Sequence, residues 1–145
     1  MAAENFDRAE KFTVGLEGMS SVAKDVGDGH GLTKYGITEK DHPGVDVKNL
    51  TLDQAKEIYK KEYWDHFGCD ALSFPLDCIH FDTAVNMYSK ANQILAQSSN
   101  DPKLYLQLRT NRYRSIAAAN PSDQKYLNGW LNRVCRLKAE YLPNG

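Results

Sequence analysis

The sequence predicts a mainly helical protein of about five helices around a central helix, with a small irregular or β-hairpin lobe after the first helix. Three observations lead to this prediction. Apolar side chains recur at helical spacing through most of the chain. A glycine-rich stretch at 19–38 interrupts that spacing. Finally, residues 75–97 are apolar on two faces, which is typical of a helix that other helices surround. No linker or repeat divides the chain, so we expect one domain over 1–145.

The first helix is predicted over residues 3–17. Its apolar face comprises Phe6, Ala9, Phe12, Thr13 and Leu16. On a helical wheel Glu17 lies within roughly 20° of Phe6, so its carboxylate should leave the helix on the buried side. Gly18 follows, and glycine is well suited to end a helix.

Capping residues predict where the next helices begin. Thr51-Leu-Asp-Gln54 is a capping box, which predicts a helix running to about Asp65. Pro75 should open the central helix, because its fixed φ angle suits a first helical turn. Asp101, followed by Pro102, should start a helix that lasts to about residue 119.

The last helix is predicted to begin at Ser122, which follows the helix-breaking Asn120-Pro121 pair. Its apolar stripe contains Tyr126, Leu127, Trp130, Val134, Leu137 and Tyr141. Trp130 lies in the middle of that stripe and is expected in the core. Arg133 lies beside the stripe and is expected to be a structural ion-pair partner.

Bulk properties exclude several functions. The net charge is −1 with both signs interspersed, which gives no basis for binding nucleic acid. No run approaches the roughly 18 apolar residues that span a membrane. Residues 1–6 lack the pattern of a secretory signal, so we expect synthesis in the cytoplasm and export by other machinery or by lysis. We also expect a monomer.

Cysteine and histidine spacing gives no sign of a metal or cofactor site. Cys69, Cys78 and Cys135 are an odd number without a CxxC pair, and they are expected to be reduced thiols, most of them buried. The histidines do not have metal-ligand spacing either. Asp77 and His80, three residues apart, fit a solvated pair on one helix.

Glu17 has the position that glycosidic hydrolysis requires of its acid. That reaction needs one carboxylic acid to protonate the leaving oxygen and a second group to activate water or stabilise the transition state. Burial against apolar side chains keeps such an acid protonated by disfavouring its charged form. The glycine-rich stretch after Glu17 could then supply the second group.

Three ordered motifs resemble glycoside hydrolase family 108, the phage-type N-acetylmuramidases, some of which are labelled secretion activators. The first is Glu17-Gly18 with the run Thr33-Lys-Tyr-Gly-Ile-Thr38. The second is Phe81-Asp-Thr-Ala-Val-Asn86, and the third is Tyr126-Leu-Asn-Gly-Trp-Leu-Asn-Arg-Val134. The resemblance implies a lysozyme-like fold and cleavage of the β-1,4 bond between N-acetylmuramic acid and N-acetylglucosamine in peptidoglycan, without a cofactor.

The resemblance makes Glu17 the general acid and leaves its partner open. Asp28 and Asp25 both lie in the glycine-rich turn, and Asp28 ranks slightly higher because it stands nearer the Thr33–Thr38 run. Thr33 is the third candidate, because a hydroxyl can both donate to and accept from a nucleophilic water. Met19 stands where the family has a second glycine.

Two further residues are candidates for binding the sugar. Tyr35 could stack on a sugar ring, or fill the joint between the lobe and the helices. Asn86 could bond an N-acetyl group, or satisfy a buried backbone carbonyl. A wall-binding or secretion-assisting protein without catalysis is the alternative function, and Met19 is its best argument. A chitinase-like activity is a third possibility.

Overall fold

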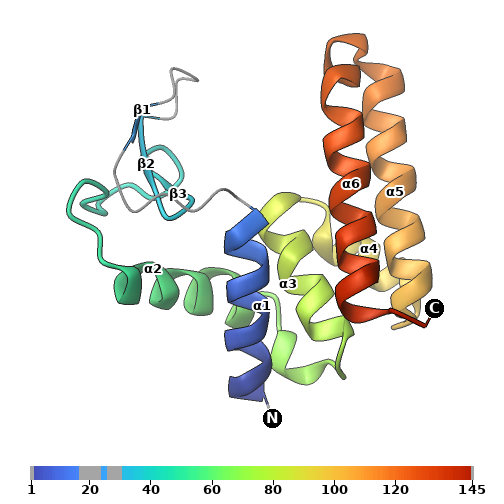
Figure 1. The fold of residues 1–145 in the computed structure, drawn as a ribbon, viewed down its shortest axis with the longest axis horizontal. Coiled ribbons are helices and arrows are strands. Elements are labelled where there is room, and N and C mark those ends of the chain that lie inside the picture. The colour runs from blue at the N-terminus through green and yellow to red at the C-terminus, as the bar shows by residue number, and fades with distance from the viewer. Residues whose placement is uncertain (1, 17–23, 26–30, 145) are drawn as a thin grey trace. The chain divides into compact units, whose positions relative to one another are not determined.

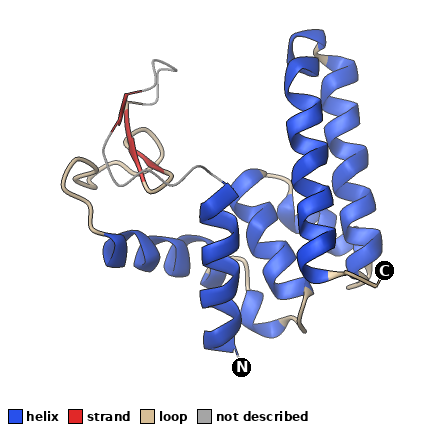
Figure 2. Cartoon of the chain, in the orientation of Figure 1, coloured by secondary structure: helices blue, strands red, loops and turns tan. Residues whose placement is uncertain are grey.

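The computed structural model describes residues 2–16, 24–25 and 31–144 (Figure 1). This part of the chain is mainly helical, with a small antiparallel sheet after the first helix (Figure 2). It forms two compact units, residues 1–66 and 67–145. The expectation of one domain stays a prediction.

The first unit contains two helical segments and the sheet. In chain order it has α1 (Ala2–Leu16), β1 (Lys24–Asp25), β2 (Leu32–Lys34), β3 (Ile37–Thr38), α2 (Leu52–Tyr59) and a π-helical continuation, η1 (Lys60–Asp65). The strands are antiparallel in the order β1-β2-β3. The small β lobe predicted after the first helix is therefore confirmed.

The capping box predicted at Thr51 starts α2. The Thr51 hydroxyl accepts a bond of 3.1 Å from the backbone N–H of Gln54, and the Gln54 side chain accepts one of 3.0 Å from the N–H of Thr51. Two N–H groups that helix geometry leaves unpaired are thus satisfied locally. The helical path ends at Asp65, as predicted.

The second unit is helical throughout. It contains η2 (Cys69–Ala71), α3 (Leu76–Asn86), α4 (Ala91–Ser98), α5 (Pro102–Ala119), η3 (Pro121–Asp123) and α6 (Gln124–Tyr141). The long helices α5 and α6 pack side by side as an antiparallel pair (Figure 1). Asp101 caps α5 as predicted, since its carboxylate accepts bonds from the N–H groups of Lys103 and Leu104.

The prediction of one helix over 75–97 is wrong, and two helices occupy this segment. All side chains from Leu76 to Ala84 are buried, which confirms the expectation that this helix is surrounded. Helix α3 nevertheless ends at Asn86, and Met87 leaves helical geometry with φ −132° and ψ 57°. At this end of α3 the side-chain oxygen of Asn86 is held by Tyr113 and Arg109 of α5. The apolar pattern continues beyond this break because α4 also buries one face, and the two helices therefore look like one in the sequence.

Ser122 is not the cap of the last helix, so that prediction is also wrong. Pro121 starts a short 3-10 turn, in which the N–H of Asp123 bonds to the carbonyl of Asn120 at 2.8 Å. Ser122 therefore lies inside a turn, and α6 begins only at Gln124, without a side-chain cap. The proline fixes its own φ and begins the turn at once.

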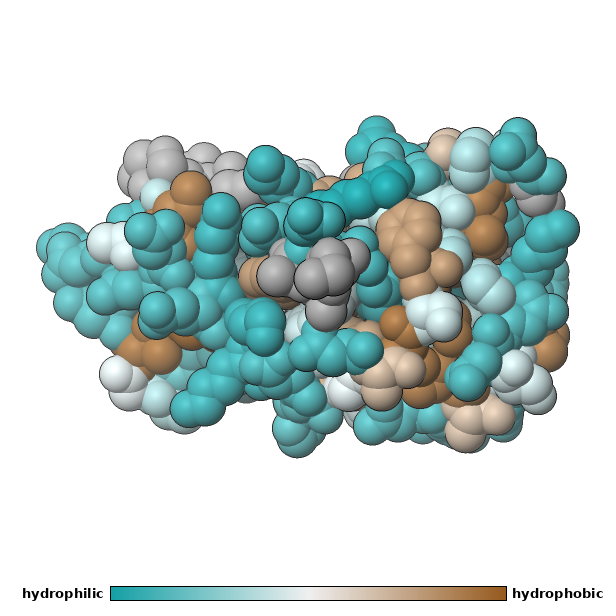
Figure 3. Space-filling model, turned by 90° about the horizontal axis from the view of Figure 1, so that it is seen from below, coloured by the Kyte–Doolittle hydropathy of each residue, from teal (hydrophilic) through white to brown (hydrophobic). Residues whose placement is uncertain are grey.

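Hydrophilic side chains cover most of the face in Figure 3, and hydrophobic ones come in smaller groups between them. The large hydrophobic residues exposed among those described are Leu52, Phe74, Tyr88, Leu104 and Tyr126. Among the described helices, none has the length and apolar character that crossing a bilayer requires.

Candidate functional site

The predicted acid Glu17 lies directly after the last residue of α1, and both Glu17 and Asp28 are outside the described residues. Asp25 belongs to β1, where its backbone pairs with Leu32. Their catalytic roles stay predictions. The structure does describe the positions of two other candidates, Thr33 and Tyr35.

Thr33 occupies the centre of the sheet. It lies in β2, paired with Lys24 of β1 on one side and with Thr38 of β3 on the other. Its side chain is half-buried. A residue paired on both sides has a fixed backbone, which is a suitable support for a side chain that positions a nucleophilic water.

Tyr35 and Gly36 form the two-residue turn between β2 and β3. Their φ angles are 52° and 78°, both left-handed, and the flanking pair is Lys34 with Ile37. Two positive φ angles in a two-residue hairpin define a type I′ turn, which matches the twist of the strands. The Tyr-Gly-Ile-Thr part of the motif is therefore a hairpin, with glycine where left-handed geometry costs nothing.

Tyr35 is an unusual residue for a left-handed position, because its Cβ crowds the backbone there. Tyr59, buried in α2, donates a hydrogen bond of 2.9 Å to the Tyr35 carbonyl and so holds the turn. The Tyr35 ring is half-buried, with the Lys34 ammonium 5.6 Å from its centre. Part of the ring remains accessible to a sugar.

Replacing Tyr35 with asparagine separates the two interpretations of this residue. Asparagine tolerates left-handed geometry well, so we expect the free energy of unfolding to stay within about 1 kcal/mol of the wild type. If the ring stacks on sugar, sedimentation with insoluble peptidoglycan should decrease. Unchanged sedimentation would show that Tyr35 only builds the turn.

His42 connects the lobe to η1, and Glu39 joins two parts of the lobe to each other. His42 is buried, with Nδ1 3.1 Å from the Thr38 carbonyl and Nε2 2.9 Å from a Glu62 carboxylate oxygen on η1. Glu39 accepts a bond of 2.5 Å from the N–H of Leu32, while its own N–H donates to the Leu32 carbonyl at 3.0 Å. These contacts hold the sheet in place, and none of the sequence motifs predicted them.

Glu10 is a buried carboxylic acid that the sequence analysis missed. It lies in α1 and is only 3% exposed. Burial raises its pKa, while the nearby ammonium of Lys56 acts in the opposite direction. The signal in the sequence was its place four residues after Phe6, on the apolar face of the same helix.

The raised pKa of Glu10 predicts a pH-dependent gain from Glu10→Gln. A pKa raised by folding means that ionisation weakens the native state, so the penalty appears as pH rises above the ordinary value of 4.5. We expect Glu10→Gln to have a higher thermal midpoint than the wild type at pH 7 and the same midpoint at pH 3. A difference that is independent of pH would contradict this account.

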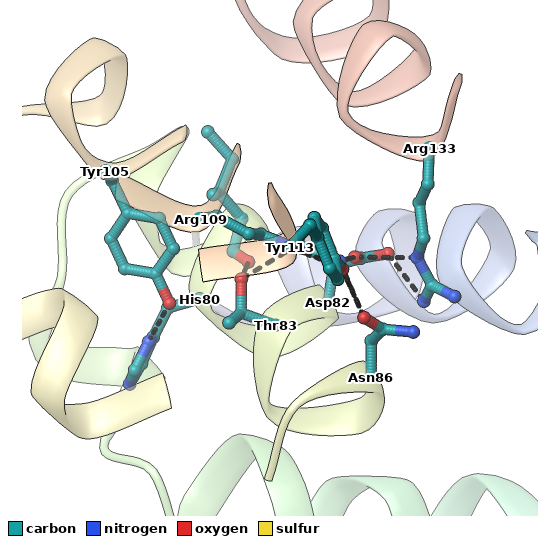
Figure 4. Close-up of polar contacts among 9 residues, drawn as sticks. His80, Asp82, Thr83, Asn86, Tyr105, Arg109, Tyr113 and Arg133 are labelled. Atoms are coloured by element: carbon teal, nitrogen blue, oxygen red, sulfur yellow. Dashed lines mark hydrogen bonds and ion pairs between the residues drawn. The ribbon is translucent and has the colours of Figure 1, made fainter. Parts of the chain in front are cut away.

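In the second unit, the second sequence motif builds a buried ion-pair cluster (Figure 4). Asp82 of α3 meets Arg109 of α5 at 2.7 Å, and both side chains are fully buried. Arg133 of α6 adds a two-pronged contact to the same carboxylate, with distances of 3.0 and 3.1 Å. The expectation that Arg133 is a structural ion-pair partner is thus confirmed, and three helices are joined at one carboxylate.

Asn86 belongs to the same cluster. Arg109 donates to the Thr83 hydroxyl at 2.9 Å and to the Tyr113 hydroxyl at 3.0 Å. The Tyr113 hydroxyl in turn donates to Oδ1 of Asn86, which Arg109 also approaches at 3.5 Å. The polar residues of the motif therefore hold α5 against α3, and the carbonyl side of Asn86 is already engaged.

His80 and Asp77 are buried, so the prediction of a solvated pair is wrong. His80 Nδ1 lies 2.7 Å from the Tyr105 hydroxyl, inside the helical core (Figure 4). Burial lowers the pKa of His80 to about 4, so the ring is neutral at neutral pH. The spacing of three residues is typical of a pair on the surface of a helix. Here, however, every side chain in this part of α3 is buried from solvent.

The His80 pKa predicts acid sensitivity. A histidine whose pKa is depressed by folding stabilises the native state above its ordinary value of 6.5, and this contribution is lost as pH falls toward 4. Two to three pKa units correspond to about 3 kcal/mol. We expect His80→Gln to flatten the decline in unfolding free energy between pH 6.5 and 4, measured by urea titration. An unchanged slope would assign the decline to other groups.

Among the described residues, no three histidine, cysteine, aspartate or glutamate side chains form a group that could hold a metal ion. Cys69 and Cys78 are buried free thiols, and Cys135 is an exposed one.

Comparison with known proteins supplies the family. The model of the glycosyl hydrolase 108 family matches residues 11–87, which is 77 of the 145 residues. The match spans Glu17, the hairpin and the polar residues of α3, whereas the resemblance at 126–134 lies beyond it and stays a prediction. No curated protein and no solved structure matches the chain significantly. With more than half of its length matched, the chain belongs to the glycosyl hydrolase 108 family.

Proposed function

We propose that the protein is an N-acetylmuramidase that cleaves the β-1,4 bond between N-acetylmuramic acid and N-acetylglucosamine in peptidoglycan. Glu17 protonates the leaving oxygen. A second group from the lobe, Asp28, Asp25 or a water held by Thr33, completes the reaction. No cofactor takes part in this scheme, and the protein acts as a monomer.

The observation that carries this proposal is the family match over both the acid and the lobe that follows it. Two features of the scaffold support it further. Glu17 comes directly after the end of a helix whose inner face is buried. The hairpin after it has a rigid centre at Thr33 and a sugar-sized aromatic ring at Tyr35.

The experiment is the loss of turbidity of purified peptidoglycan, together with release of reducing sugar, for the wild type and Glu17→Gln. Asp25→Asn, Asp28→Asn and Thr33→Ala then rank the candidates for the second group. The variant that loses most activity without losing stability identifies the partner. Equal activity of the wild type and Glu17→Gln would reject Glu17 as the acid.

Met19 favours one alternative, a protein that binds the cell wall or assists secretion without catalysis. A side chain where the family has a second glycine restricts the backbone right after the acid. Sedimentation with peptidoglycan without release of reducing sugar would support this alternative. Activity on chitin oligomers, with none on peptidoglycan, would instead support a chitinase-like enzyme.

The route to the substrate is a separate part of the proposal. The protein is made in the cytoplasm and reaches the cell wall through a holin or a secretion system. Its role is then lysis or secretion. Expression with and without a co-expressed holin, followed by culture turbidity, tests this part independently of the chemistry.

A further inference from the structure

A pocket of about 220 Å³ lies in the second unit, where the turn after α3 meets α5 and α6. The residues that matter to its chemistry are Asn86, Lys90, Arg112, Ile116 and Trp130. Its volume is below the about 300–1,000 Å³ of pockets that bury drug-sized ligands. It therefore suits one compact group of a polymer and is too small to enclose a long glycan segment.

Asn86 lines this pocket and has a hydrogen-bond donor that its contacts in the cluster do not use. Its Oδ1 is held by the Tyr113 hydroxyl, which can donate there because it accepts from Arg109 Nε. Arg109 carries only donors, so the oxygen of Asn86 must face the cluster. The amide nitrogen then points away from these bonds, as Figure 4 shows. A carbonyl group of a ligand is the natural partner for this N–H₂.

Two cations line the same pocket. Lys90 follows the turn after α3, and Arg112 lies on the exposed side of α5. Neither side chain is paired with a carboxylate in the part of the chain that the structure describes. Arg109 and Arg133, by contrast, are both committed to Asp82. Lys90 and Arg112 are therefore available to an anion from outside.

The remaining wall is apolar and rigid. The Trp130 ring is stacked on the buried Tyr113 ring, with their centres 5.1 Å apart and their planes at 20°. Ile116 lies beside them. The Tyr126 ring also lies near Trp130, with centres 6.0 Å apart and planes at 33°. The part of the half-buried Trp130 ring that lines the pocket offers an apolar surface for a methyl group or for part of a sugar.

We infer that this pocket binds an N-acyl group with a carboxylate close to it, the combination that the peptide-bearing muramic acid of peptidoglycan presents. Asn86 donates to the acyl or peptide carbonyl, Lys90 and Arg112 pair with the carboxylate, and Trp130 covers the apolar part. The identity of the polymer rests on the proposed function. The pocket itself lies in the second unit and adds a binding site for the peptide-bearing part of the substrate.

Muramyl dipeptide is a suitable probe, because it carries the acetamido, peptide and carboxylate groups but lacks the glycosidic bond to be cleaved. The chain has two tryptophans, and Trp64 is fully buried in the first unit. Titration should therefore produce a saturable change in fluorescence that comes from Trp130. Trp130→Phe should remove that change. N-acetylglucosamine, which has no carboxylate, should bind at least about tenfold more weakly.

Two kinds of variant test the inference. Asn86→Asp keeps an oxygen for Tyr113 and Arg109 but replaces the donor with an acceptor. Lys90→Gln combined with Arg112→Gln removes the charges from a surface that contributes little to folding. We expect each to weaken binding at least about tenfold, with Arg114→Gln, an exposed arginine of the same helix outside the pocket, unchanged.

The outcomes separate this inference from the proposed function. Wild-type affinity in the Lys90→Gln and Arg112→Gln double variant, or no saturable signal in the wild type, would overturn the pocket assignment even if peptidoglycan is hydrolysed. Binding that depends on these residues would support it even if Glu17→Gln leaves hydrolysis unchanged, a result that would reject only the proposed acid.

Discussion

Replacing Arg109 with methionine is expected to lower the free energy of unfolding by about 3–5 kcal/mol, the usual effect of removing one partner of a buried ion pair. Methionine fills much of the same volume but leaves the fully buried Asp82 with one counter-ion in place of two. Thr83 and Tyr113 lose a donor at the same time. Since domains are stable by about 5–15 kcal/mol, this loss is a large share of the total.

Urea titration followed by circular dichroism measures this effect, and Arg114→Met is the matched control. Arg114 lies on the same helix but is exposed, so the same substitution should change the unfolding free energy by about 0.5 kcal/mol or less. Equal effects of the two substitutions would mean that the cluster adds nothing to stability.

The second large effect is expected for Glu17→Gln. A positioned general acid contributes about 10²–10⁴-fold to the rate, and glutamine cannot give up a proton. We expect the initial rate of reducing-sugar release to fall by about that factor, while sedimentation with peptidoglycan stays near the wild-type level. Loss of binding together with loss of rate would point to a damaged site and not to a missing acid.

Glu4→Gln controls for the substitution itself. Glu4 lies in the first turn of α1 and is exposed, so removing its charge changes the same helix without touching the predicted acid. Its activity should remain within about twofold of the wild type, because an exposed carboxylate contributes little energy. Thermal midpoints of both variants should match the wild type closely, which makes the rate the informative quantity.

Local sequence patterns correctly predicted the helix starts and turns that depend on residues close together in the sequence. The capping box at Thr51 and the cap at Asp101 place two helix starts correctly, because each depends on hydrogen bonds within four residues. The glycine-rich interruption correctly indicated a lobe, since positive φ angles at Gly31 and Gly36 require glycine or an unusual substitute. The motifs indicated the family, which the match over residues 11–87 confirmed, and this match includes the first two of the three motifs.

Contacts between residues far apart in the sequence determined where α3 ends and which polar residues are buried. The break at Met87 and the burial of His80 depend on what packs against α3, and apolar periodicity does not specify that. The burial of Glu10 likewise depends on what packs against α1. Asn86 and Arg133 stand 47 positions apart in the sequence, yet they share a cluster built around Asp82.

The sequence by itself determined that the chain is mainly helical with a small β lobe after the first helix, and it indicated Glu17 as the predicted acid. Only the tertiary structure decided which polar residues are committed to the fold and which remain available to a ligand. The physical reason is that a hydrogen bond or ion pair between helices depends on side-chain direction and burial, which a one-dimensional pattern does not contain. Asn86 has both roles, because its oxygen is engaged in the core while the residue also lines the pocket.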